Sequence, residues 1–185
     1  ELKTEEVLKA AVEKHGADSG SIIVMDPKTG AVLAMANYPT FDPNVYSKVK
    51  DVATFNNLAT VGNYEPGSIF KPLTMAMAVN EGKVNAESTF VDTGSALIDG
   101  YTIKNSDLKA HGTQTMSQVL EESLNTGAIY AKNQVGNEKF LDYVKKFGFG
   151  SPTGIELPEG KGDLSGLNSN IQVNYATASF GQGIN

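Results

Sequence analysis

The first forty residues show two different hydrophobic periods. Over residues 2–15, apolar positions recur at the spacing of one helix face, and Gly16 is a favourable residue just after a helix end. The positions expected on that face are Leu2, Val7, Leu8, Ala11 and Val12. The stretches GSIIVMD (20–26) and AVLAMAN (31–37) instead resemble strands, and DPKTG (26–30) supplies a turn between them. The pattern predicts a helix followed by a β-hairpin.

Beyond the hairpin, the pattern is mainly helical. Helices are expected over residues 68–80, over 115–136 with a polar break at 123–127, between Asn137 and Gly148, and weakly over 169–180. In the third of these we expect the inward side chains to be Phe140, Tyr143, Val144 and Phe147. Short strands are expected at STFVDTG (88–94) and YTIKN (101–105), whereas 45–63 shows no clear element and 151–166 is expected to be a loop. No repeat or linker divides the chain, so we predict one α/β (α+β) domain over 1–185, with a sheet packed against helices.

Composition narrows the range of functions. The chain has 185 residues, of which 40% are hydrophobic, and no apolar run approaches the ~18 residues of a membrane span. Cysteine is absent, which excludes thiol catalysis and cysteine-based zinc sites. The net charge is −6, all fifteen basic residues are lysines, and no basic cluster favours nucleic-acid binding. His15 and His111 have no metal-ligand spacing, so we expect no metal and assign both to structural or surface positions.

The segment YEPGSIFKP (64–72) places Ser68 three residues before Lys71, just after a Pro-Gly turn. Positions i and i+3 share a helix face, so the lysine amine would stand beside the serine hydroxyl. A serine becomes a good nucleophile when a neighbouring base removes its proton. Lysine serves as that base only when burial or nearby positive charge lowers its pKa. The alternative is an ordinary helix start, with Ser68 as the N-cap and Lys71 on the solvated side.

A second polar motif, SLNTG (123–127), interrupts a predicted helix. Ser123 and Asn125 in such a bend could both point into one cleft, where a hydroxyl relays a proton and an amide holds an ammonium or a substrate carbonyl. The alternative is a polar cap at an interhelical turn.

Together, YEPGSIFKP, SLNTG and the hairpin-and-loop DPKTGAVLAMANYPTFDPN resemble the transpeptidase domain of class B penicillin-binding proteins, over nearly all of the chain. The resemblance implies the penicillin-binding-protein/β-lactamase-like fold and peptidoglycan D,D-transpeptidation. By resemblance, Ser68 is the nucleophile, Lys71 its base and Ser123 a proton relay, while Asn125 orients Lys71 and contacts the substrate amide. The implied partners are stem peptides ending in D-Ala-D-Ala, β-lactams and other cell-wall synthesis proteins, without a cofactor. The implied location of the parent protein is the extracytoplasmic face of the cell membrane, through an amino-terminal anchor.

One departure from the family pattern qualifies this expectation. The third family motif, Lys-Thr-Gly, is expected downstream of SLNTG, whereas Lys28-Thr29-Gly30 precedes the nucleophile and falls in the predicted hairpin turn. We therefore expect a partial transpeptidase domain that lacks the carboxy-terminal cleft strands. The segment Gly181-Gln182-Gly183 fits a place near the cleft or a helix-entry turn, and we interpret Glu65 as structural. The alternatives to a transpeptidase are a D,D-carboxypeptidase, a β-lactamase, a β-lactam sensor, or a non-catalytic scaffold.

Overall fold

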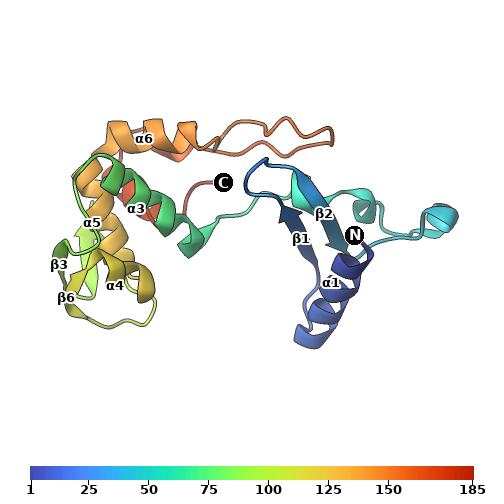
Figure 1. Cartoon of the computed structure of the whole chain (residues 1–185), viewed down its shortest axis with the longest axis horizontal. Helices are drawn as coiled ribbons and strands as arrows, with labels where there is room; N and C mark the ends of the chain where they lie inside the picture. Colours follow the sequence, from blue (N-terminus) through green and yellow to red (C-terminus); the bar gives the residue numbers. More distant parts are fainter. The chain divides into compact units, whose positions relative to one another are not determined.

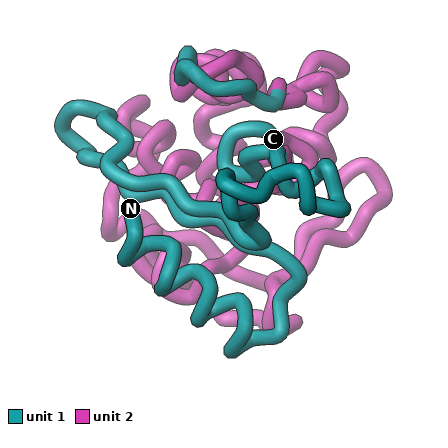
Figure 2. The backbone as a smooth tube through the Cα atoms, turned by 90° about the vertical axis from the view of Figure 1, so that its right-hand side faces the viewer, with its two compact units in different colours: residues 1–62, 154–160 teal, residues 63–153, 161–185 magenta.

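The structure is a computed structural model that describes all of residues 1–185. Figure 2 shows the two compact units into which the chain divides. Unit 1 contains residues 1–62 and 154–160, and unit 2 contains residues 63–153 and 161–185. The predicted domain over 1–185 contains both units.

Unit 1 begins with one helix and one hairpin, as predicted. Helix α1 (Leu2–His15) ends at Gly16, whose φ of 62° is left-handed, and it lies along strands β1 (Gly20–Met25) and β2 (Val32–Tyr38) (Figure 1). The strands are antiparallel, with Gly20 opposite Tyr38. Of the five apolar positions expected on one face of α1, only Leu8 and Val12 are buried. Leu2 and Val7 are exposed because a two-stranded hairpin covers only a narrow stripe of a helix.

The hairpin turn explains why Lys28-Thr29-Gly30 occurs there. The Asp26 carboxylate accepts hydrogen bonds from the Lys28 backbone N–H and from the Thr29 hydroxyl, and the Gly30 backbone N–H donates to the Asp26 carbonyl. An aspartate that bonds its own backbone two residues on forms a local turn. The triplet therefore has the turn-forming contacts that its position in the sequence predicts.

The rest of unit 1, which showed no clear pattern in the sequence, consists of three short helical turns. These are η1 (Pro43–Lys48), η2 (Val52–Phe55) and α2 (Leu58–Val61). Each begins at a residue whose side chain accepts from the backbone N–H two residues on: Asp42, Asp51 and Asn57. Such caps satisfy backbone donors that a one-turn helix leaves unpaired.

Unit 2 carries most of the helices. Its elements are η3 (Gly67–Phe70), α3 (Lys71–Asn80), β3 (Thr89–Asp92), β4 (Ser95–Ile98), β5 (Tyr101–Lys104), β6 (Gly112–Thr115), α4 (Met116–Glu121), α5 (Asn125–Val135), α6 (Asn137–Lys146), η4 (Ser165–Leu167) and α7 (Gln172–Ala178). Two antiparallel pairs form, β3 with β6 and β4 with β5. The sequence predicted β3 and β5 but not their partners: β4 (SALI) shows no alternation of apolar and polar residues, and β6 (GTQT) has no large apolar residue.

The core of unit 2 lies between α3, α5 and α6. Phe70, at the end of η3, is 1% exposed, and its ring contacts those of Phe140 and Phe149 at centroid distances of 6.3 and 5.1 Å. Phe140 and Val144 of α6 are fully buried, as predicted. Phe147, also expected inward, is 49% exposed because the helix ends there and the side chain leaves the buried stripe. This packing fixes the start of α3, where the candidate site lies.

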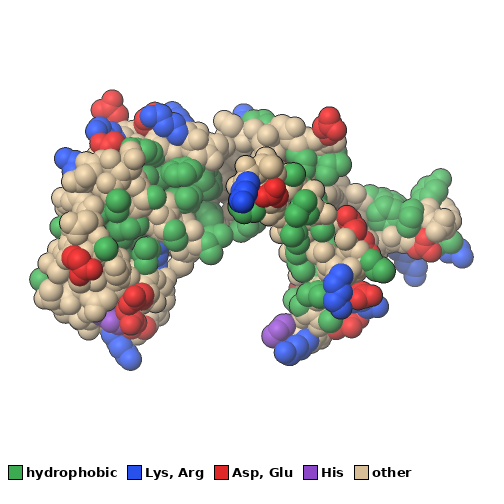
Figure 3. Space-filling view, viewed as in Figure 1, with side chains coloured by type: hydrophobic (Ala, Val, Ile, Leu, Met, Phe, Trp, Pro, Cys, Tyr) green, Lys and Arg blue, Asp and Glu red, His purple; other side chains and the backbone are tan.

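Hydrophobic side chains also reach the surface of both units (Figure 3). In unit 2 the exposed large ones include Ile69, Val91 and Leu97. Single exposed apolar side chains are normal on folded proteins. None of the helices combines the length and the hydropathy that a bilayer crossing requires.

Candidate active site

The Ser68–Lys71 pair lies where one turn of 3₁₀ helix runs into α3. Pro66 and Gly67 introduce the turn, and Gly67 has a φ of 62°. Lys71 Nζ lies 3.1 Å from Ser68 Oγ, within hydrogen-bond distance. Ser68 is exposed, and neither η3 nor α3 has a side-chain cap. The alternative of Ser68 as a capping residue is therefore wrong.

Lys71 is buried, with 2% of its surface exposed. The alternative that placed it on the solvated side is therefore wrong as well. None of the ion pairs in the structure includes Lys71, so no carboxylate offsets its positive charge. Burial disfavours the charged form and lowers the pKa of Lys71 from 10.5 to about 8. Such a lysine is neutral in a usable fraction of molecules near neutral pH.

Ser123, fifty-five residues after Ser68, lies on another side of the same amine. Lys71 Nζ donates to the Ser123 hydroxyl at 3.0 Å and to the Ser123 carbonyl at 2.5 Å. With Ser68 Oγ, this makes three oxygen neighbours for a group that carries three N–H bonds when charged. The structure thus joins YEPGSIFKP and SLNTG through a single lysine.

Ser123 holds a backbone conformation that favours glycine. Its φ is 53°, in the left-handed region. The Ser123 N–H donates to the Leu120 carbonyl and the Leu124 N–H to the Val119 carbonyl, which is the Schellman arrangement at the end of α4. Glycine is the usual residue at this position, and a non-glycine residue there costs roughly 1 kcal/mol or more. A serine kept in this strained position, with its hydroxyl on Lys71, favours a functional role over a simple cap.

Asn125 occupies a different position from the one expected for a residue that orients Lys71. It begins α5, and its side-chain amide donates to the Lys104 carbonyl of β5 at 2.8 Å. The structure contains no hydrogen bond between Asn125 and Lys71. Its amide oxygen Oδ1 accepts no hydrogen bond within the chain. The structure thus brings Ser68, Lys71 and Ser123 together, and leaves Asn125 anchored to β5 with a free acceptor.

A buried carboxylate that sequence reasoning missed anchors this region. Asp92, at the end of β3, is 2% exposed and accepts four hydrogen bonds. The donors are the backbone N–H groups of Gly94 and His111, the Asn105 amide and the Thr126 hydroxyl. Burial raises the pKa of Asp92, but the hydrogen bonds together outweigh it and hold the pKa below 3.8. Through Thr126 the carboxylate fixes the first turn of α5, beside SLNTG. The signal in the sequence was an aspartate directly after an apolar strand.

A second buried lysine lies farther along α5. Lys132 is 2% exposed, and burial lowers its pKa to about 8 as well. Its amine donates to Asn137 Oδ1 at 3.1 Å and lies 5.8 Å from the centre of the Tyr175 ring. No hydroxyl that could act as a nucleophile accepts from it. Sequence reasoning did not single out this residue, because a lysine on a helix is usually solvated.

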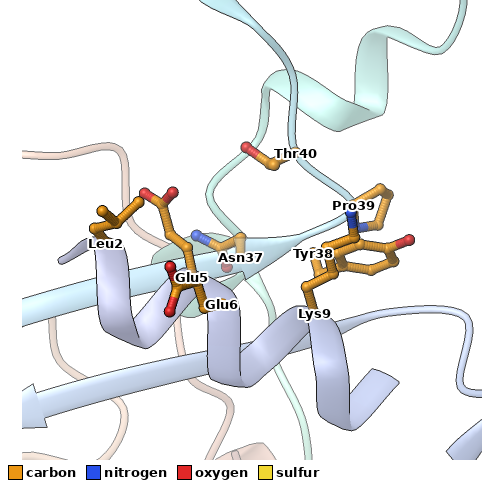
Figure 4. Close-up of a pocket in the computed structure, with 8 residues that line it drawn as sticks. All are labelled: Leu2, Glu5, Glu6, Lys9, Asn37, Tyr38, Pro39 and Thr40. Carbon is orange, nitrogen blue, oxygen red and sulfur yellow. The ribbon is translucent and has the colours of Figure 1, made fainter. Parts of the chain in front are cut away.

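The hollow shown in Figure 4 belongs to unit 1 and contains none of the predicted site residues. It has a volume of about 410 Å³, and its lining residues come from α1 and from the end of β2 and the residues after it. These residues are Leu2, Glu5, Glu6, Lys9, Asn37, Tyr38, Pro39 and Thr40. Nothing in it resembles a nucleophile paired with a base. No group of three histidine, aspartate or glutamate side chains in residues 1–185 is placed to hold a metal ion.

Comparison with known proteins agrees with this fold. A family model described as penicillin binding protein transpeptidase domain matches residues 20–185. The chain therefore belongs to the penicillin-binding-protein transpeptidase family.

Individual relatives extend the comparison over almost the whole chain. The chain is 40% identical to stage V sporulation protein D of Bacillus subtilis, over 97% of this chain and 28% of that protein. It is 36% identical to the probable peptidoglycan D,D-transpeptidase PbpC of Pseudomonas aeruginosa, over 94% of this chain and 31% of that protein. It matches the crystal structure of penicillin binding protein 3 from Mycobacterium tuberculosis, complexed with aztreonam, with a TM-score of 0.87 and 30% identity, over 99% of this chain and 41% of that one. The chain thus spans less than a third of the length of these two curated relatives.

Proposed function

We propose that this chain carries the acylation centre of a peptidoglycan D,D-transpeptidase, with Ser68 as the nucleophile. The observation that carries the proposal is the position of Lys71: buried, without a carboxylate partner, and within hydrogen-bond distance of the hydroxyls of both Ser68 and Ser123. Family membership supports the reaction class, as does the transpeptidase named among the relatives. The substrate is a peptidoglycan stem peptide ending in D-Ala-D-Ala, and the site acts on the extracytoplasmic face of the membrane.

The neutral form of Lys71 acts as the base. A neutral amine has two N–H bonds and one lone pair. The two N–H bonds go to the Ser123 hydroxyl and carbonyl, which directs the lone pair at the Ser68 proton. With a pKa of about 8, roughly a tenth of the lysine is neutral at pH 7. That fraction suffices because an effective general base has a pKa near the working pH.

The reaction then proceeds in two halves. Lys71 takes the Ser68 proton while Ser68 Oγ bonds to the carbonyl carbon between the two D-alanines. The ammonium returns a proton, through the Ser123 hydroxyl, to the departing D-alanine nitrogen as the C–N bond breaks. An amine of a second stem peptide attacks the acyl-enzyme, loses a proton by the reverse route, and releases Ser68 with its hydroxyl restored. β-Lactams acylate the same serine because their strained amide mimics the D-Ala-D-Ala bond.

Two further groups serve the substrate in this proposal. The Ser68 backbone N–H lies in the first turn of a helix, where it has no intrahelical partner, and it stabilises the oxyanion. The free Oδ1 of Asn125 accepts from the substrate amide, while the Asn125 amide nitrogen stays on Lys104. Asn125 thus contacts the substrate directly, without the second role on Lys71 that the resemblance implied.

The test is intact-mass spectrometry of the purified chain after incubation with benzylpenicillin. The proposal predicts one penicilloyl adduct in the wild type and in Ser106→Ala, a matched change at another exposed serine of unit 2, and none in Ser68→Ala. Circular dichroism of each variant establishes that the fold is retained. An adduct in Ser68→Ala, or none in the folded wild type, would reject Ser68 as the nucleophile of this chain.

A further inference from the structure

The segment after α7 touches the surroundings of Ser68 at every second residue. We call this segment, Ser179–Gly183, the clasp. Its three contacts are hydrogen bonds from Thr74 Oγ1 to the Ser179 carbonyl (2.7 Å), from the Gly67 N–H to the Gly181 carbonyl (2.9 Å), and from the Gly183 N–H to Glu65 Oε1 (2.7 Å). The partners lie just before Ser68, or one helical turn after Lys71. More than a hundred residues of chain separate the two sides of each contact, so this is a specific tertiary arrangement.

The middle contact brings two backbones so close that a side chain has no room. A Cβ added at Gly181 would lie 2.2 Å from the Gly67 carbonyl oxygen and 2.6 Å from the Gly67 nitrogen. Gly181 also has a φ of 81°, which L-residues rarely adopt. Gly67 immediately precedes the proposed nucleophile. Any displacement of Gly181 is therefore transmitted directly to the backbone of Ser68.

The outer two contacts fix the ends of the clasp. Thr74 and Ser179 are completely buried, and Thr74 lies on α3 one turn after Lys71. At the other end, the Glu65 carboxylate accepts the Gly183 N–H, and hydrogen bonds to a charged acceptor are stronger than neutral ones. The Ser179 end of the clasp thus contacts the helix that carries Lys71, and the Gly183 end contacts the turn that precedes Ser68.

We propose that the clasp positions the Ser68 hydroxyl for attack, with Glu65 and Gly181 as positioning residues. The inference rests on the proposed function, because it assumes that Ser68 is the nucleophile. The tight turn restricts the backbone position of Ser68. A misplacement of about 1 Å at a reacting atom can cost ~10²-fold in rate. Glu65 is exposed and makes no hydrogen bond to Lys71 or Ser123, whereas its carboxylate accepts the Gly183 N–H of the clasp.

The first experiment separates positioning from binding. Time courses of penicilloyl-adduct formation at several benzylpenicillin concentrations give a dissociation constant for the first complex and a rate constant for acylation. For Glu65→Ala we expect the acylation rate constant to fall about tenfold with little change in the dissociation constant. Glu65→Gln keeps a side-chain oxygen that can accept the Gly183 N–H, so we expect it to restore most of the rate. Equal rates in Glu65→Ala and the wild type would overturn the inference.

A glycine pair supplies a stronger test with a matched control. Gly181→Ala forces a Cβ into the Gly67 backbone, and we expect acylation to fall by about 10²-fold. Gly82→Ala has the same unfavourable sign of φ (63°) but open space around its Cβ, and it lies at the far end of α3. We expect Gly82→Ala to acylate at the wild-type rate after a similar loss of backbone stability. Equal rates in the two variants would contradict a positioning role for the clasp.

Amide hydrogen exchange measured by NMR distinguishes failure of this inference from failure of the proposed function. The clasp predicts slow exchange at Gly67 and Gly183 in the wild type, faster exchange at both in Glu65→Ala, and near-wild-type exchange in Glu65→Gln. A folded wild type that forms no adduct rejects the proposed function, and the exchange data then decide whether the clasp exists. Unchanged exchange at Gly67 in Glu65→Ala overturns the inference, even if Ser68 is acylated.

Discussion

Unit 2 buries two lysines to the same degree, but the groups around their amines differ. Lys71 and Lys132 are each 2% exposed, each lacks an ion-pair partner, and burial lowers the pKa of each to about 8. Lys71 contacts two serine hydroxyls and the Ser123 carbonyl, whereas Lys132 contacts one amide oxygen and the face of a tyrosine ring. The pKa alone therefore does not distinguish a base from a structural lysine. The distinction comes from whether a nucleophile lies within reach of the amine.

The largest expected difference between the two lysines is in acylation. Lys71→Met keeps most of the side-chain volume but removes the amine, and we expect the rate of penicillin acylation to fall by about 10²–10⁴-fold. Lys132→Met makes the same change at the other buried site, and we expect a rate within about twofold of the wild type. Adduct formation followed by mass spectrometry measures both. A wild-type acylation rate in Lys71→Met, or an equal loss of rate in both variants, would contradict the assignment of Lys71 rather than Lys132 as the base.

Both lysines should contribute alike to the pH dependence of stability. Each has a pKa near 8 in the folded chain and 10.5 as its ordinary value, so the unfolded chain binds more protons between these limits. The free energy of unfolding should therefore rise with pH from 8 to about 10, by about 2 kcal/mol for each lysine. Urea denaturation at several pH values should show that either methionine variant loses about half of the wild-type rise. If the two variants differ strongly from each other, the burial of the two amines is not equivalent.

Substitutions at Ser123 should have a smaller effect on stability, and they separate the role of its backbone conformation from the role of its hydroxyl in acylation. Ser123→Gly relieves the left-handed backbone and Ser123→Ala does not, so we expect the glycine variant to be more stable than the alanine variant by about 1 kcal/mol. Both remove the hydroxyl that contacts Lys71, so both should acylate slowly. Denaturation midpoints and adduct time courses test the two halves separately. A glycine variant that is less stable than the alanine variant would show that the conformation at Ser123 carries no strain.

The sequence predicted the site better than it predicted the site's supports. Ser68 and Lys71 lie on one short helical turn, so their spacing alone predicts their contact. The contact of Lys71 with Ser123 joins distant segments. The family resemblance implied a proton relay at Ser123, but it placed Asn125 rather than Ser123 on Lys71. Asp92 and Gly181 were missed as supports because their roles depend on long-range contacts that leave no local period.

The fold shows the same division between local and distant causes. The α1 helix and the β1–β2 hairpin follow from periodicity and from turn residues close in sequence. Strands β4 (SALI) and β6 (GTQT) were missed because neither alternates apolar with polar residues, and pairing with β5 and β3 sets their conformation. The exposed Phe147 shows that a periodic pattern gives a helix face but not the residue at which the helix ends.

The central claim is that the neutral amine of Lys71 activates Ser68, and the pH dependence of acylation tests it most directly. The rate of penicilloyl-Ser68 formation should be measured from pH 6 to 9.5 in the wild type and in Lys132→Met. The account predicts a rate that rises with pH and levels off with a midpoint near 8 in both proteins, since only Lys71 titrates at the nucleophile. A rate independent of pH over this range, or a midpoint that disappears in Lys132→Met, would contradict it.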